Sequence, residues 1–148
     1  KIPAVNTAPE TTASTDYSKI GSLKDIISTL DYISFPQEIK QVYVPGAIAE
    51  GYKETDRSEQ SKYINIFYEN DGDGWYQYRQ VTVEWNTFLD TEEGNWDSLA
   101  IGQYPGVFLD KNGIGDLWWF DYTYAYQLVG NLSEEEMMAV AESLVAEK

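Results

Sequence analysis

The stretch YAYQLVGNLSEEEMMAVAESLV, residues 124–145, decides the fold. Residues 124–129 are rich in tyrosine and aliphatic side chains, which is typical of a β-strand. A glycine and an asparagine at 130–131 interrupt this pattern. Ser133 and Glu136 then have the spacing of a capping box, and the glutamates of the first turn suit the positive end of a helix. We therefore expect a strand that leads directly into a capped helix.

The helix predicted from Ser133 has one apolar face. Its members recur at helical spacing: Met137, Val140, Ala141, Leu144 and Val145. The cap contributes about 1 kcal/mol, whereas burial of each larger apolar side chain contributes roughly 1.5–3 kcal/mol. Packing therefore decides where the helix lies, and we expect it to cover one face of a sheet.

Upstream of this stretch, strands follow one another without helices between them, so the sheet should be mostly antiparallel. The clearest hairpin joins residues 63–68 to a return strand at 75–85 through the glycine-rich turn at 70–74. The apolar face of the return strand shifts by one residue near Arg79-Gln80, which predicts a β-bulge. Further strands are predicted at 39–44, 47–55, 98–101, 106–109 and 117–120, and a polar loop at 53–62.

The N-terminal part has a different composition. Residues 1–18 are mostly small, polar or proline, which predicts a flexible tether, with an ordered arm laid on the domain as the alternative. Ser22 and Asp25 can cap a short helix that Pro36 ends. We therefore expect a tether over residues 1–18 and a single α+β domain over residues 19–148. That domain should hold a mostly antiparallel twisted sheet, a short N-terminal helix and the C-terminal amphipathic helix on one face.

The composition limits the classes of function that the chain can have. The 148 residues carry a net charge of −15 and include neither histidine nor cysteine. A negative field repels phosphate backbones, so nucleic-acid binding is not expected. Without histidine, the chain lacks the commonest general base and metal ligand. Without cysteine, it can form neither a thiolate nor a disulfide. No apolar run approaches the ~18 residues of a membrane span. We expect a non-enzymatic chain with no catalytic residue, no metal site, no cofactor and no transmembrane segment.

Two features of the sequence are compatible with a binding role. The acidic turn at 70–74 resembles part of a calcium loop, but Gln80 stands where such a loop needs its last glutamate, so a plain hairpin turn is favoured. Aromatic side chains also crowd two regions, either as a platform for a glycan or peptide, or as core residues and cross-strand pairs. The candidate exposed, ligand-binding aromatics are Trp75, Tyr76 and Tyr122, whereas Trp119, Tyr124 and Tyr126 are expected to be structural.

The C-terminal stretch also carries a resemblance. From Trp119 through the segment YAYQLVGNLSEEE to the segment AESL at 141–144, it resembles the C-terminal signature of the domain of unknown function 4367 family. The segment AEGYK at 49–53 is similar to that family's P-E-G-Y-K, with Ala49 in place of a frequent proline. The resemblance covers roughly residues 35–146. It implies an extracytoplasmic domain of Gram-positive-type bacterial lipoproteins or membrane-anchored proteins, without known catalytic residues.

Together these observations favour an exported, non-catalytic domain for protein interaction or sensing at the cell envelope. Its partner would be an unknown envelope protein or a cell-wall ligand. The sequence opens on Lys1 without a methionine, so an N-terminal signal or lipid anchor is expected to have been removed. The alternative is a carrier or binding module that holds an apolar or glycan ligand in a groove between sheet and helix. An apolar pocket there would favour the carrier, and a well-packed, flat face would favour protein contact.

Overall fold

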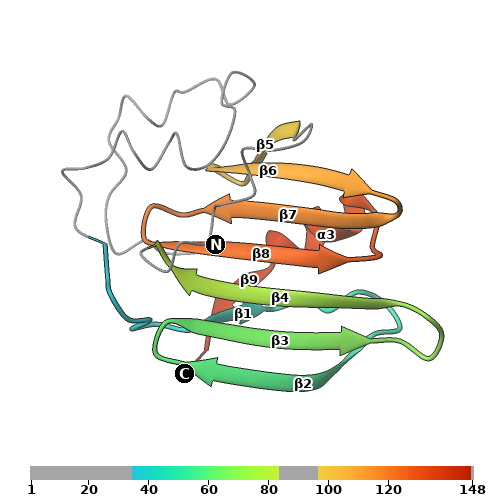
Figure 1. Cartoon of the computed structure of the whole chain (residues 1–148), viewed down its shortest axis with the longest axis horizontal. Coiled ribbons are helices and arrows are strands. Elements are labelled where there is room, and N and C mark those ends of the chain that lie inside the picture. Colours follow the sequence, from blue (N-terminus) through green and yellow to red (C-terminus); the bar gives the residue numbers. More distant parts are fainter. Residues whose placement is uncertain (1–34, 84–96, 148) are drawn as a thin grey trace.

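The computed structural model describes residues 35–83 and 97–147. Within them, seven antiparallel strands form one curved sheet in the order β2-β3-β4-β8-β7-β6-β5 (Figure 1). The strands are β2 (Lys53–Gln60), β3 (Tyr63–Glu69), β4 (Trp75–Thr82), β5 (Asp97–Ile101), β6 (Tyr104–Lys111), β7 (Ile114–Phe120) and β8 (Tyr124–Gly130). The predicted hairpin and the predicted strands at 98–101, 106–109, 117–120 and 124–129 are therefore confirmed.

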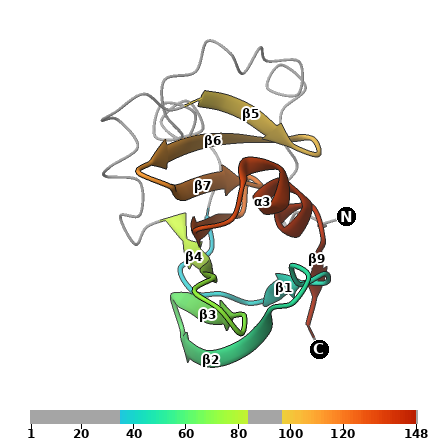
Figure 2. The same ribbon diagram turned by 90° about the vertical axis from the view of Figure 1, so that its right-hand side faces the viewer.

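A second layer lies on the concave face of this sheet. It contains helix α3 (Glu134–Ala141) and a two-stranded ribbon of β1 (Tyr43–Pro45) and β9 (Leu144–Ala146). Figure 2 shows helix and ribbon on the same side, with the sheet curving around them. An α+β arrangement with a mostly antiparallel sheet and a C-terminal helix on one face is thus confirmed. The predicted tether and the short N-terminal helix lie outside the described residues.

Helix α3 begins where the sequence predicts but ends earlier. The Ser133 hydroxyl accepts the Glu136 N–H at 3.1 Å, and the Glu136 carboxylate accepts the Ser133 N–H at 2.9 Å, which completes the capping box. The helix ends at Ala141, so the expected helical place of Leu144 and Val145 is wrong. Both lie in β9, because pairing with β1 replaces the continuation of the helix. None of the helices in the described part is long and apolar enough to cross a membrane.

The predicted bulge in β4 is also wrong. Both neighbours of β4 pair with it residue by residue, without a shift at Arg79 or Gln80. Gln80 continues the buried face of Tyr76 and Tyr78 and is itself fully buried. Its side chain accepts the Tyr43 N–H at 2.8 Å and donates to the Gln41 carbonyl at 3.0 Å. A polar residue with a structural role on the core face therefore gave the appearance of a phase change.

The predicted loop at 53–62 is largely strand β2, an edge strand of the sheet. Its residues are mostly charged or polar and exposed, and its pairing with β3 shifts between Glu54 and Asp56. Charge and irregular register are two ways in which edge strands avoid pairing with other chains. Because charged residues stand at this edge, β2 lacks the apolar alternation by which a strand is recognised in a sequence.

The core lies between the sheet and the second layer and is unusually rich in tyrosine. Trp119 stacks on Tyr126 with ring centroids 5.3 Å apart, and Tyr68 stacks on Tyr76 at 4.6 Å. Trp119, Tyr124 and Tyr126 are fully buried, which confirms their structural role. Most of the aromatic composition is therefore used to build the molecule.

Candidate functional site

Side chains of the sheet hold the backbone of the segment that crosses its concave face. Three tyrosine hydroxyls make these bonds: Tyr124 accepts the Lys40 N–H at 2.8 Å, Tyr78 donates to the Tyr43 carbonyl at 2.6 Å, and Tyr76 accepts the Ala49 N–H at 3.2 Å. Burial raises the pKa of the Tyr78 hydroxyl well above its ordinary value, so it stays a donor. The concave face therefore already binds a peptide segment, and that segment belongs to the chain itself.

Two of the three aromatic site candidates are buried. Tyr76 is 0% exposed, with its ring between those of Tyr68 and Tyr52, and Tyr122 is 2% exposed. Tyr122 lies in a turn at a φ of 71°, yet its ring packs against Phe120. The expected exposure of Tyr76 and Tyr122 is therefore wrong, because the alternation that places Tyr78 inside also places Tyr76 inside. Trp75 is half-buried and lies on the opposite face of β4.

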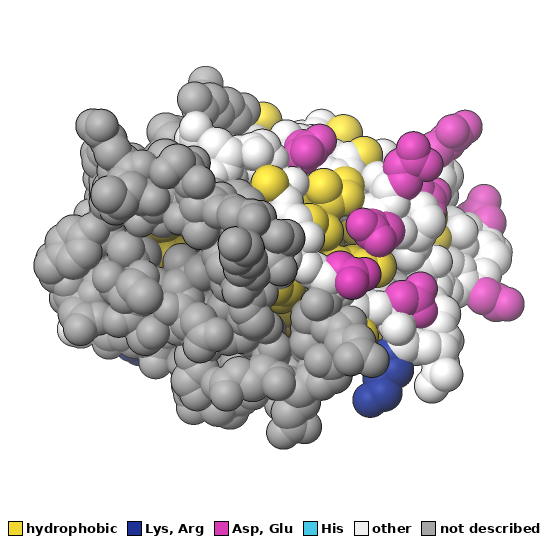
Figure 3. Space-filling view, turned by 90° about the horizontal axis from the view of Figure 1, so that it is seen from above, with side chains coloured by type: hydrophobic (Ala, Val, Ile, Leu, Met, Phe, Trp, Pro, Cys, Tyr) yellow, Lys and Arg dark blue, Asp and Glu magenta, His cyan; other side chains and the backbone are white. Residues whose placement is uncertain are grey.

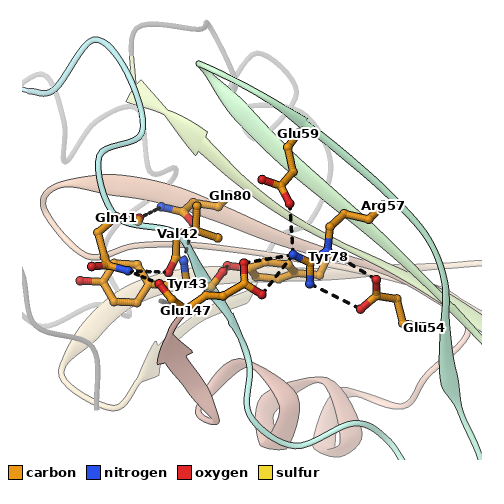
Figure 4. A network of polar contacts seen from close by, with 9 residues as sticks. All are labelled: Gln41, Val42, Tyr43, Glu54, Arg57, Glu59, Tyr78, Gln80 and Glu147. Carbon is orange, nitrogen blue, oxygen red and sulfur yellow. Dashed lines mark hydrogen bonds and ion pairs between the residues drawn. The ribbon is translucent and has the colours of Figure 1, made fainter.

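Arg57 gathers three carboxylates at the rim of the concave face (Figure 4). Its guanidinium lies 3.4 Å from Glu54, 3.1 Å from Glu59 and 3.0 Å from Glu147, and we call these four residues the Arg57 cluster. Partial burial lowers the pKa of Arg57, but its hydrogen bonds to Glu59 and Glu147 outweigh this and raise the pKa above the ordinary value. Gln41 also donates to the Glu147 carbonyl at 2.8 Å. The cluster therefore ties the residue after β9 to the edge of the sheet.

Asp121 is a fully buried carboxylate in the turn between β7 and β8. It accepts the N–H groups of Thr123 and Tyr124 at 2.9 and 2.8 Å and the hydroxyl of Tyr126 at 2.7 Å. Burial raises its pKa, and these hydrogen bonds partly oppose the shift. Because the carboxylate is shielded and its oxygens are occupied, its role is to shape the turn.

The acidic turn at 70–74 is closed by amide side chains. The Asn70 side-chain oxygen accepts the N–H groups of Gly72 and Gly74, each at 2.9 Å, and Asn131 donates to the Asp73 carbonyl at 3.0 Å. Among the described residues, no group of three acidic side chains is placed to hold a metal ion. These bonds match the hairpin turn that the sequence favours over a calcium loop.

The remaining candidate is the convex face of the sheet, turned away from α3. Several half-buried or exposed side chains lie on one half of this face, with the exposed carboxylates Asp56 and Glu69 beside them, and we call the following six the convex patch: Phe67, Trp75, Gln77, Arg79, Asp116 and Val129. Figure 1 looks onto this face, and no described segment crosses the half where β4 begins. Phe67 is one of the few large apolar side chains in the described part that are exposed.

A polar ladder runs through the convex patch across β3, β4, β8 and β7. Arg79 donates to Asn65 at 2.8 Å and to Gln127 at 3.5 Å, and Gln127 donates to Asp116 at 2.8 Å. Burial lowers the pKa of Arg79, while Tyr63 and Asp116 oppose this effect, and an arginine stays charged in any case. One cation and one carboxylate therefore share the centre of the patch.

The balance of charge at the centre of the patch differs from that of the whole chain. The chain has 25 acidic and 10 basic residues, and Figure 3 shows acidic side chains projecting around the end where β6 turns into β7. The sequence held a signal for the patch, since Asn65, Asp116 and Gln127 are polar residues within largely apolar strands and Arg79 is the one charged residue of β4. Only the register shows that they lie side by side.

A family model described as Domain of unknown function (DUF4367) matches residues 42–144. The match runs from β1 to the first residue of β9 and includes the capping box and the tyrosine-rich strand β8. No curated protein matches the chain. The matched signature residues that we have described build the core and the helix cap, so the match identifies the domain and names no site.

Proposed function

The chain belongs to the DUF4367 family, whose function is unknown, and we propose that it is a non-catalytic, exported interaction or sensing module that docks a partner protein on the convex patch. The observation that carries this proposal is an amphipathic sheet face that presents Phe67 and Trp75 beside the hydrogen-bonded Arg79. The cell-envelope location is proposed from the composition of residues 1–18 and from the family resemblance.

The chemistry of the convex patch suits a protein partner. Aromatic residues and arginine are enriched where protein interfaces gain most of their binding energy, while aspartate and glutamate are depleted there. The patch offers Phe67, Trp75 and Arg79 together, and hydrogen bonds to Asn65 and Gln127 hold the guanidinium in place before a partner arrives. A group that is already fixed loses less conformational entropy on binding.

The alternative carrier function needs space between sheet and helix. At Gly115 on β7, an added Cβ atom would lie 3.0 Å from the ring of Phe108 and 3.2 Å from the sulfur of Met137 on α3. Helix and sheet are therefore in close contact at this point, which supports the protein-contact proposal over a ligand groove.

The proposal is tested by affinity capture from solubilised envelope fractions. The wild-type chain should enrich a specific envelope protein, and Phe67→Asp should lose it because a charge is placed in the patch. Ile48→Asp is the matched control, since Ile48 is 44% exposed and lies before β2, outside the patch. Equal capture by the two variants would contradict docking at the patch. Glycan-array binding without an enriched protein would favour the glycan alternative.

A further inference from the structure

The C-terminal segment has two competing local structures. Val140, Leu144 and Val145 continue a helical stripe, and Ala, Glu and Leu in this segment are good helix formers. In the structure, however, α3 ends at Ala141 and Leu144–Ala146 forms β9. Contacts with the rest of the molecule therefore hold residues 144–146 as a strand, although the sequence of this segment favours a helix.

Ser143 lies where the helix changes to strand. Its hydroxyl donates to the Val140 carbonyl at 2.6 Å and accepts the Ala47 N–H at 3.1 Å. In a continuing helix, the Val140 carbonyl would accept the N–H of Leu144. The Ser143 N–H donates to the same carbonyl at 3.1 Å, so the last turn of the helix closes with i→i+3 spacing at Val140.

Few contacts hold β9 in place. Leu144 is buried, but Val145 is 47% exposed and Ala146 is also exposed. Backbone bonds to β1 and its neighbours include Gly46 N–H to Ser143 and Glu147 N–H to Val42, both at 2.8 Å. Side chains add the bond from Gln41 to the Glu147 carbonyl at 2.8 Å and the ion pair between Glu147 and Arg57, whose side chains are both partly exposed (Figure 4). Such pairs contribute little in water.

The neighbouring strand β1 does not depend on β9. Its other edge is held by the sheet, because Gln80 accepts the Tyr43 N–H and Tyr78 donates to the Tyr43 carbonyl. Tyr43 itself is 3% exposed. If β9 left, β1 would remain fixed and would present an unpaired edge beside Arg57.

We propose that β9 is displaceable and that the edge of β1 beneath it binds an extended strand of a partner protein. The chemistry of β9 defines that strand: it pairs antiparallel with β1, places an apolar side chain where Leu144 lies, and brings a carboxylate to Arg57. Residues 142–147 then extend α3. Addition of a strand to an open edge is a common mode of peptide recognition. This surface is separate from the convex patch and does not rest on it.

The probe is a fluorescent peptide of residues 142–148, ESLVAEK, measured by polarisation against the full chain. Glu147→Gln in the protein weakens the internal strand but leaves Arg57 for the glutamate of the peptide. We expect it to tighten peptide binding roughly threefold, as for the loss of one partly exposed ion pair. Ser143→Ala should act in the same direction, because it removes the hydroxyl that accepts the Ala47 N–H and so loosens the attachment of the C-terminal segment. Glu142→Gln, an exposed helix-end residue outside the Arg57 cluster, should bind as the wild type does.

A disulfide supplies the decisive control. Val44 and Val145 are directly opposite in the ribbon, where paired Cα atoms lie about 4.5–5.5 Å apart, within disulfide range. Because the chain has no cysteine, Val44→Cys with Val145→Cys gives a single possible bond. Oxidation should weaken peptide binding more than about tenfold, and reduction should restore it.

Three results would overturn the proposal. The oxidised and reduced double variants could bind the peptide equally, or the peptide with Leu144→Asp could bind as well as the original. A Glu147→Gln protein that elutes as a dimer would show that a second copy, and not a partner strand, occupies the edge.

Discussion

At the scale of single residues, Gln80 shows how a buried amide organises the concave face. It satisfies both the Tyr43 N–H and the Gln41 carbonyl. Gln80→Met keeps the volume but leaves both backbone groups unpaired, so we expect a loss of about 1–3 kcal/mol in the free energy of unfolding. Gln77→Met, on the half-buried convex side of the same strand, should change it by less than about 0.5 kcal/mol. Urea denaturation of the two variants measures the difference, and equal midpoints would contradict it.

Asp121 gives a prediction about pH. Burial raises its folded-state pKa above the unfolded value, so its contribution to stability is complete below the unfolded pKa and is lost as the pH rises through the folded one. Asp121→Asn abolishes this titration. We therefore expect the variant to lose stability relative to the wild type as the pH falls from 7 towards 4. Urea denaturation across that range tests this, since the other carboxylates titrate in both proteins. A pH-independent difference would contradict the prediction.

Single residues also show why the exposure of the aromatic candidates could not be predicted from the sequence. Trp75, Tyr76 and Tyr122 are all candidates for exposed rings, but Trp75 is half-buried and the other two are buried. Burial of Tyr76 follows from strand phase, and burial of Tyr122 depends on contacts with Phe120 and Tyr104 that only the fold creates. Proximity to a turn is therefore a poor guide to the exposure of an aromatic ring.

At the scale of elements, Gly130 controls how closely β8 approaches β4. An added Cβ atom would lie 2.4 Å from the Trp75 carbonyl oxygen and 2.6 Å from the Tyr76 Cα. Because backbone atoms cannot move aside cheaply, Gly130→Ala should cost about 1–3 kcal/mol. Gly72→Ala is the matched control, since its Cβ atom would meet only the Asn70 side chain at 3.7 Å. Thermal melting should separate the variants clearly, and similar melting temperatures would exclude this packing argument.

Elements with apolar alternation were predictable, and those shaped by their surroundings were not. The hairpin of β3 and β4 and the strands β5 to β8 follow from local pattern. Strand β2 was missed because an exposed edge favours charge over alternation. Strand β9 was predicted as helix because its preference is helical, and pairing with β1 decides otherwise. Sequence pattern thus located most strands of the sheet and failed at the edge strand β2 and at strand β9 of the ribbon.

At the scale of the whole molecule, the net charge of −15 opposes compaction. Salt shortens the range of this repulsion to about 10 Å at 0.1 M, so the melting temperature should rise as sodium chloride increases from low concentration. Calcium chloride at the same ionic strength should give the same rise, because the described residues place no group of three acidic side chains to hold a metal ion, and the Asn70 side-chain oxygen and the Asp73 carbonyl of the turn are already hydrogen-bonded. Scanning calorimetry at matched ionic strength distinguishes screening from binding. Extra stabilisation by about 1 mM calcium, removed by Asp71→Asn with Asp73→Asn, would restore the calcium-loop interpretation of that turn.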